Sequence, residues 1–142
     1  MEDDGKTIQR RMIEEVYNKG RLDLIDDLIA PEYLGHDPAL PRDIVGPPGE
    51  KELVAGYRAA FPDLRITIDD QIAENDRVVA RWTARGTHAG DLWGIAGTGK
   101  DITVTGTSVD RISEGRIIES WSNWDTLGLM QQLGVVPVMA QI

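Results

Sequence analysis

The sequence contains no cysteine and only two histidines, His36 and His88. Without cysteine the chain cannot form a disulfide, a thiolate nucleophile, a zinc finger or a cysteine-ligated iron–sulfur cluster. Two histidines are also too few for a multi-histidine metal site. The chain carries no phosphate-binding Gly-Lys-Ser loop, no GxSxG elbow and no HExxH helix. We therefore expect a protein that works without a metal or another cofactor.

Positive charge is scarce as well. Lys and Arg number 15 against 24 Asp and Glu, so the net charge is 15 − 24 = −9. An acidic surface repels phosphate backbones and anionic headgroups, so we expect neither nucleic acid nor a membrane as a partner. No stretch approaches the roughly 18–20 apolar residues of a membrane span. The acidic start, Met-Glu-Asp-Asp-Gly, lacks the features of a signal peptide, and we expect a cytoplasmic protein.

The length of 142 residues, 41% of them hydrophobic, suits one globular domain over 1–142. Apolar residues recur at helical spacing over 4–20, over 22–30 and again before residue 62. We expect helices there, and a turn-rich segment over 32–48 with a short extended piece at Tyr33–Leu34. Glycine or proline bounds these helices, at Gly20, Pro31, Pro47, Pro48 and Pro62.

From residue 64 the apolar period changes to two, which predicts about four antiparallel strands up to residue 124. Turns are expected at 74–76 and at Glu114-Gly115, and a glycine-rich segment at 86–99. Asp125 is placed to cap a short final helix over 126–133. Helices followed by strands indicate an α+β fold, with helices on one face of a curved sheet and a pocket at its open end.

Several segments resemble the SnoaL-like polyketide cyclase family. They are the stretch Gly86–Gly94, the Gly99-Lys100 turn, the long segment Asp110–Gly134, and the opening pieces Val16–Gly20 and Leu28–Tyr33. The resemblance implies a cone-shaped α+β barrel, in which a curved antiparallel sheet wraps around the N-terminal helices. Ketosteroid isomerases and nuclear transport factor 2-like proteins share this fold, and homodimers are frequent among them.

The resemblance also implies an activity. Cyclases of this family close a polyketide ring by an intramolecular aldol reaction, in which a carboxylate removes a proton and a histidine assists. The carboxylate position aligns with Ser122 and the histidine position with Ser108. A serine hydroxyl is too weak a base without an activating neighbour. The fold therefore carries over, whereas the reaction needs other residues.

Asp110 is the first substitute for the missing base, because it shares strand parity with Ser108 and would face the same side of the sheet. Burial in the cone would raise its pKa and suit it to proton abstraction. A solvated carboxylate, or an ion pair with Arg111 or Arg81, is the alternative.

The histidines offer two further catalytic candidates. His36, oriented by Asp37, could act as a general base at the pocket mouth, or it could be a surface-loop residue. His88 could donate a hydrogen bond to a ligand carbonyl, or it could cap a bulged strand end.

Aromatic side chains and the two serines are expected to line the pocket, although most of the aromatic residues would also serve the core. The predicted lining consists of Tyr17, Tyr33, Tyr57, Phe61, Trp82, Trp93, Ser108, Ser122 and Trp124. Trp121, of opposite parity to Ser122, should lie on the outer sheet face, where it favours a homodimer interface.

Three classes of function follow. The first is a cofactor-free cyclase or isomerase that acts on a small hydrophobic, polyketide-like carbonyl compound. Non-catalytic binding of such a molecule is the second, and protein interaction through the outer sheet face is the third. Epoxide hydrolysis is less favoured, because it needs an inward arginine and Trp82, not Arg81, has inward parity.

Overall fold

The computed structural model describes residues 2–138, with side chains from residue 5 onward. Two helical segments form one continuous N-terminal helix, α1 (Glu2–Arg11) and the π-helical η1 (Met12–Tyr17). The remaining elements are η2 (Leu22–Leu24), α2 (Ile25–Leu28), β1 (Ile29–His36), β2 (Ile44–Val45), α3 (Gly46–Ala60), β3 (Arg65–Glu74), β4 (Arg77–Thr87), β5 (Asp101–Ser113), β6 (Arg116–Trp124) and α4 (Thr126–Gln132).

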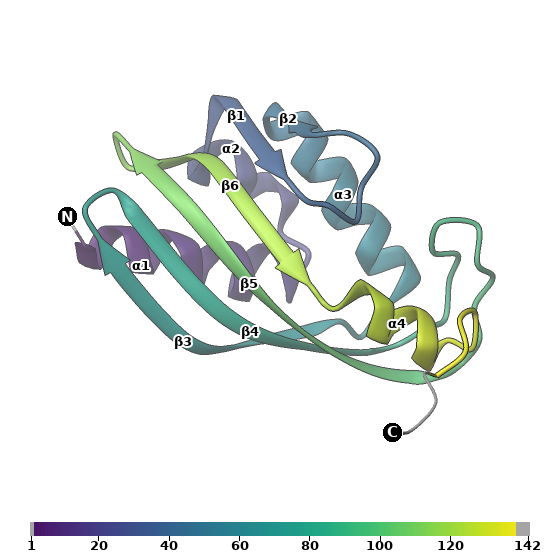
Figure 1. Cartoon of the computed structure of the whole chain (residues 1–142). Helices are drawn as coiled ribbons and strands as arrows, with labels where there is room; N and C mark the ends of the chain where they lie inside the picture. The colour runs from purple at the N-terminus through teal and green to yellow at the C-terminus, as the bar shows by residue number, and fades with distance from the viewer. Residues whose placement is uncertain (1, 139–142) are drawn as a thin grey trace.

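The six strands form one curved sheet in the order β2-β1-β6-β5-β4-β3. The long strands β3 to β6 pair in antiparallel fashion, and α1 and α3 lie on one side of them (Figure 1). The predicted α+β fold is therefore confirmed. The sheet is not closed into a barrel, because β2 and β3 remain at its two edges, and it is not wholly antiparallel, because β1 runs parallel to β6.

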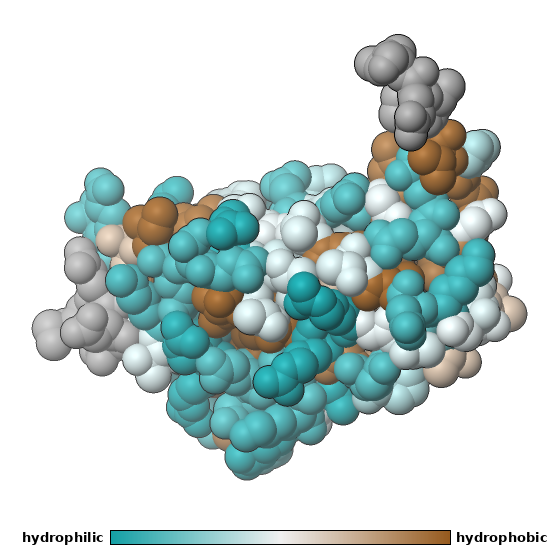
Figure 2. All heavy atoms as spheres, turned by 90° about the horizontal axis from the view of Figure 1, so that it is seen from below, coloured by the Kyte–Doolittle hydropathy of each residue, from teal (hydrophilic) through white to brown (hydrophobic). Residues whose placement is uncertain are grey.

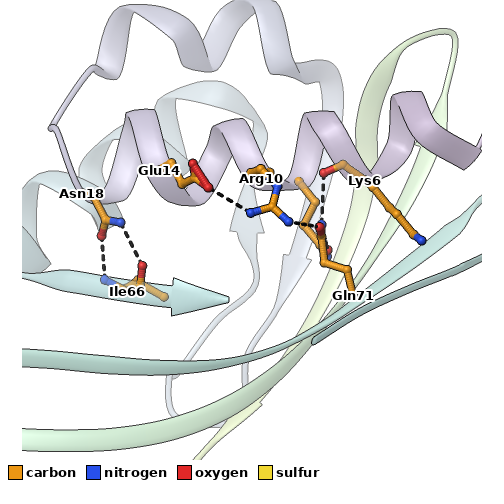
Figure 3. Close-up of polar contacts among 7 residues, drawn as sticks. Lys6, Arg10, Glu14, Asn18, Ile66 and Gln71 are labelled. Carbon is orange, nitrogen blue, oxygen red and sulfur yellow. Dashed lines mark hydrogen bonds and ion pairs between the residues drawn. The ribbon is translucent and has the colours of Figure 1, made fainter. Parts of the chain in front are cut away.

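Polar contacts fix the N-terminal helix to the edge strand β3 (Figure 3). The Asn18 side chain donates to the carbonyl of Ile66 at 2.8 Å and accepts from its amide at 2.6 Å. The Gln71 amide donates to the carbonyl of Lys6 at 3.0 Å, and Arg10 donates to the Gln71 oxygen at 2.8 Å. The Asn18 bonds occupy backbone groups at the open edge of β3, and together with the Gln71 bonds they hold the helix across the sheet.

The helix α3 begins and ends where the prolines predict. Pro47 and Pro48 occupy its first turn, where a missing amide hydrogen costs nothing. The preceding Gly46 has a φ of +66°, a left-handed conformation that glycine adopts without steric cost. The last bond runs from the Phe61 amide to the Tyr57 carbonyl at 2.8 Å, just before Pro62.

The segment after α2 differs from its prediction. Pro31 does not end a helix, because the chain is already extended from Ile29 and passes through Pro31 as part of β1. Pairing with β6 is recorded at Ile29 and resumes at Leu34, so Pro31 lies in an irregular stretch where its missing amide hydrogen breaks no pairing. Tertiary pairing with a distant strand therefore overrides the local helical pattern.

A bulge in β6 reverses the facing of its first residues. Arg111 pairs with Glu119 and Ile112 with Ile117, which leaves Ile118 as an extra residue. Ile117 is consequently buried in the core, although strict alternation from Ser120 would turn it outward. Beyond the bulge, Ser120, Ser122 and Trp124 face the inside of the fold.

The face seen from below Figure 1 is mostly hydrophilic, and hydrophobic residues form small separate patches on it (Figure 2). No helix within residues 2–138 is both long and apolar enough to cross a membrane.

Candidate functional site

Side chains from the N-terminal helix, α3 and the sheet enclose a cavity of about 160 Å³ that is partly open to solvent. Its wall is mainly apolar and aromatic, since large side chains from both layers converge on it. Eight of the nine residues predicted to line it do so: Tyr17, Tyr33, Tyr57, Phe61, Trp82, Ser108, Ser122 and Trp124. Trp93 does not line it; this residue is 45% exposed, and its ring packs against Tyr57 and Trp124.

Asp110 lies in this wall on β5 and is buried. Its Oδ1 accepts a hydrogen bond from the Ser120 hydroxyl at 2.6 Å, and its Oδ2 accepts from the Gln9 amide at 3.1 Å. Burial raises the pKa of Asp110, and the bonds from Ser120 and Gln9 lower it by less. The predicted alternative of an ion pair is wrong, because Arg111 binds Glu119 and Arg81 binds Asp70.

Glu50 is a second buried carboxyl in the wall, and the sequence analysis missed it. The Tyr17 hydroxyl donates to Glu50 Oε1 at 2.9 Å, whereas Oε2 has no hydrogen-bond partner in the described part of the chain. Burial raises the pKa of Glu50 to about 7, with a smaller contribution from the negative charge of Asp110. A carboxyl with a pKa near 7 can take or give a proton at neutral pH.

A periodic signal for Glu50 was present in the sequence. Glu50, Val54 and Tyr57 recur at spacings of four and three, so they share one face of α3. A carboxylate on an otherwise apolar helical face is a candidate for function, because burial of an unpaired charge is costly.

The two serines predicted to line the pocket, Ser108 and Ser122, form a hydrogen bond with each other. Ser108 and Ser122 face each other across β5 and β6, with their hydroxyl oxygens 2.9 Å apart. The Trp82 indole donates to the Ser108 hydroxyl at 3.0 Å. This chain of bonds keeps one wall polar without supplying a base.

A third polar group lies where α3 meets the end of β6. The Trp124 indole donates to Asp37 Oδ2 at 3.0 Å and meets the Tyr57 ring edge-on, with centroids 6.5 Å apart. The Tyr57 hydroxyl is buried and has no hydrogen-bond partner within residues 5–138. It is therefore a free donor in the cavity wall.

His36 is among the residues that line the cavity, but acidic side chains engage both nitrogens of its ring. Its Nε2 lies 2.7 Å from Glu119, its Nδ1 lies 3.1 Å from Asp43, and the ring packs on Trp121 at 5.6 Å. Glu119 and Trp121 alternate with the inward residues Ser120 and Ser122, so they lie on the outer sheet face. The hydrogen bonds from Glu119 and Asp43 raise the pKa of His36. Both ring nitrogens are thus engaged by carboxylates, and Asp43 and Glu119, not Asp37, orient the ring.

His88 is fully buried beside Phe61, outside the cavity wall. Its Nδ1 accepts from the Thr98 amide at 3.2 Å, so the ring ties the base of the 88–100 loop together. Among the residues with described side chains, the cavity wall contains no arginine or lysine, and no group of acidic or histidine side chains could hold a metal ion. A neutral ligand suits this acidic wall better than an anion.

The fold and the hollow first define a class: an α+β protein whose helices and curved sheet surround a ligand-sized cavity. Solved structures support this assignment. TsrD from Streptomyces laurentii is 29% identical, with a TM-score of 0.85 over 96% of this chain and 98% of that one. A protein of Acidithiobacillus ferrooxidans, provisionally described as a polyketide cyclase, is 36% identical, with a TM-score of 0.83 over 92% and 94% of the two chains.

The chain belongs to the SnoaL-like polyketide cyclase family, whose model matches residues 7–133. The aklanonic acid methyl ester cyclase DnrD of Streptomyces peucetius is 31% identical over 131 residues, which are 88% of this chain and 87% of the relative. The resemblance inferred from the sequence is thereby confirmed.

Proposed function

We propose that this protein is a cofactor-independent cyclase or isomerase that binds a small hydrophobic, polyketide-like carbonyl compound in its cavity. The shared chemical step is removal of a proton from the carbon next to a carbonyl group by a buried carboxyl. The observation that carries the proposal is the pair of buried carboxyls, Asp110 and Glu50, in the wall of a mainly apolar cavity. Desolvation makes such a carboxylate a stronger base than it is in water.

The cavity size supports a compact reacting group. A cavity of about 150 Å³ holds one benzene molecule, and this one measures about 160 Å³. One six-membered ring therefore fits inside the cavity. Further rings of a larger polyketide would extend through the open side.

The family relationship supplies the first substrate to test. DnrD is named for the cyclisation of aklanonic acid methyl ester. This compound and smaller aromatic 1,3-diketones therefore form the panel of compounds to be tested as substrates. Wild-type protein should accelerate ring closure, or exchange of the proton beside the carbonyl for deuterium, on at least one member. General-base catalysis contributes about 100-fold to 10,000-fold, so the double variant Asp110→Asn, Glu50→Gln should lose at least about 100-fold. No acceleration by the wild type on any member would refute the enzyme proposal.

Non-catalytic binding is the second candidate, and the Ser108–Ser122 hydrogen bond favours it, because both hydroxyls serve each other rather than a base. Quenching of the fluorescence of Trp82 and Trp124, which line the cavity, reports binding without turnover. Saturable quenching by a panel member, combined with no measurable reaction, would show that the protein binds the compound without converting it.

A further inference from the structure

The two buried carboxyls differ in how their oxygens are used. Each oxygen of Asp110 accepts a hydrogen bond from the protein, one from Ser120 and the other from Gln9. Gln9 is itself held, because the Gln71 amide donates to its oxygen at 3.0 Å and its own amide also donates to the Val78 carbonyl at 3.2 Å. Both carboxylate oxygens of Asp110 are therefore hydrogen-bonded to the protein, and its side chain is held in place.

Glu50 has the opposite arrangement. Tyr17 orients its carboxyl through Oε1, which leaves Oε2 without a partner among the described side chains, although the residue is 96% buried (4% exposed). An unsatisfied buried carboxylate oxygen is costly, and such groups need an explanation. A ligand proton in the cavity would provide the missing partner.

We propose that Glu50 is the catalytic residue that carries the proton in this cavity, with Tyr17 and Asp110 as the residues that position and tune it. This inference rests on the proposed function and adds its proton-transferring group, which lies on α3 rather than on the two strands where the family pattern places it.

The step balances without a co-reactant. Glu50 Oε2 takes the proton from the carbon beside a carbonyl, and the electrons of the broken C–H bond form an enolate. In ring closure the enolate carbon attacks a second carbonyl of the same molecule, and the new alkoxide takes the proton back from Glu50. In isomerisation the proton returns to another carbon. The substrate and product therefore have the same composition, and Glu50 ends as a carboxylate.

Tyr57 is placed to assist this step. It follows Glu50 by seven residues on the same face of α3, about 10 Å along the helix axis, and its hydroxyl also lacks a partner in the described residues. A carbonyl oxygen that becomes an enolate needs a hydrogen-bond donor. The pair thus offers a free acceptor and a free donor to one ligand.

The first test compares Glu50→Gln with Glu52→Gln, a matched change at an exposed position of the same helix. With the most reactive panel compound, Glu50→Gln should lower kcat at least about 100-fold with KM changed less than threefold, and Glu52→Gln should match the wild type. If the wild type is active and the kcat of Glu50→Gln lies within threefold of the wild-type value, the role of Glu50 is overturned and the proposed function stays intact. An inactive wild type would overturn both.

The pH profile tests the same inference without removing Glu50. The ionisable groups that influence the Glu50 carboxyl are Tyr17, Asp110, Tyr33 and Asp37. The Tyr17 hydroxyl, and to a smaller extent the Tyr33 hydroxyl, lowers the pKa of Glu50, and the Asp110 charge raises it. Because the base must be ionised, kcat should rise with pH around 7 in the wild type. Tyr17→Phe should move this rise in kcat to higher pH. Asp110→Asn should move it to lower pH while activity persists. Loss of all activity in Asp110→Asn, with no shift in Tyr17→Phe, would contradict the inference and assign the base to Asp110.

Discussion

At the scale of single residues, buried Glu50 makes the stability of the fold depend on pH. Its pKa lies at about 7 in the folded protein against an ordinary value of 4.5. The folded state therefore holds the proton more tightly, and the stability that this provides is lost as the pH rises from 4.5 through 7. One pKa unit corresponds to about 1.4 kcal/mol, so the whole effect is about 3 kcal/mol.

The variant Glu50→Gln removes this titration and keeps the size of the side chain. The free energy of unfolding of the variant minus that of the wild type should be about 3 kcal/mol larger at pH 8 than at pH 4, because only the wild type loses stability over this range. Urea denaturation at the two pH values measures the difference, and Glu52→Gln controls for the loss of a surface charge. Equal differences at both pH values would show that Glu50 is not held in a desolvated site.

Parity with Ser108 placed Asp110 on the inner face of the sheet, because β5 pairs with β6 without a register shift between these two residues. Parity could not place His36, since the loop pattern concealed a strand that pairs with β6 and brings the ring against Trp121. Glu50 was missed for another reason. A glutamate in a helix is usually solvated, and only packing against η1 and the sheet buries this one.

At the scale of elements, α4 depends on the N-cap residue that precedes it. The Asp125 side chain accepts from the Gly128 amide at 2.8 Å and caps a helix of seven residues. Asp125→Ala should lower the free energy of unfolding by about 1 kcal/mol, whereas Asp125→Asn should retain most of the stability because Asn also caps helices. Thermal unfolding of the two variants measures the difference. An alanine variant as stable as the wild type would show that packing of Leu129 and Leu133 alone holds α4.

Long periodic elements were predictable, whereas short paired ones were not. The four long strands and α3 follow from alternation and from the proline positions. The strand β1 and the bulge at Ile118 depend on pairing between segments far apart in the sequence. Local pattern carries no information about that pairing, so these elements required the structure.

At the scale of the whole molecule, the outer sheet face is the predicted homodimer surface. Trp121 lies there between His36 and Arg77, whose guanidinium is 5.5 Å from the ring centroid. Analytical ultracentrifugation should give a dimer for the wild type and a shift towards monomer for Trp121→Glu, because a buried unpaired charge opposes association. A wild type that remains monomeric at every concentration would refute this interface.

The central claim is that the hollow between α3 and the sheet receives the reacting end of a small hydrophobic ketone. A crystal structure of the protein with a one-ring aromatic 1,3-diketone tests it most directly. The account predicts the ring inside the cavity, its acidic carbon facing Glu50 and a carbonyl oxygen within hydrogen-bond distance of the Tyr57 hydroxyl. A ligand bound only on the exterior, with both groups still unpartnered, would contradict it.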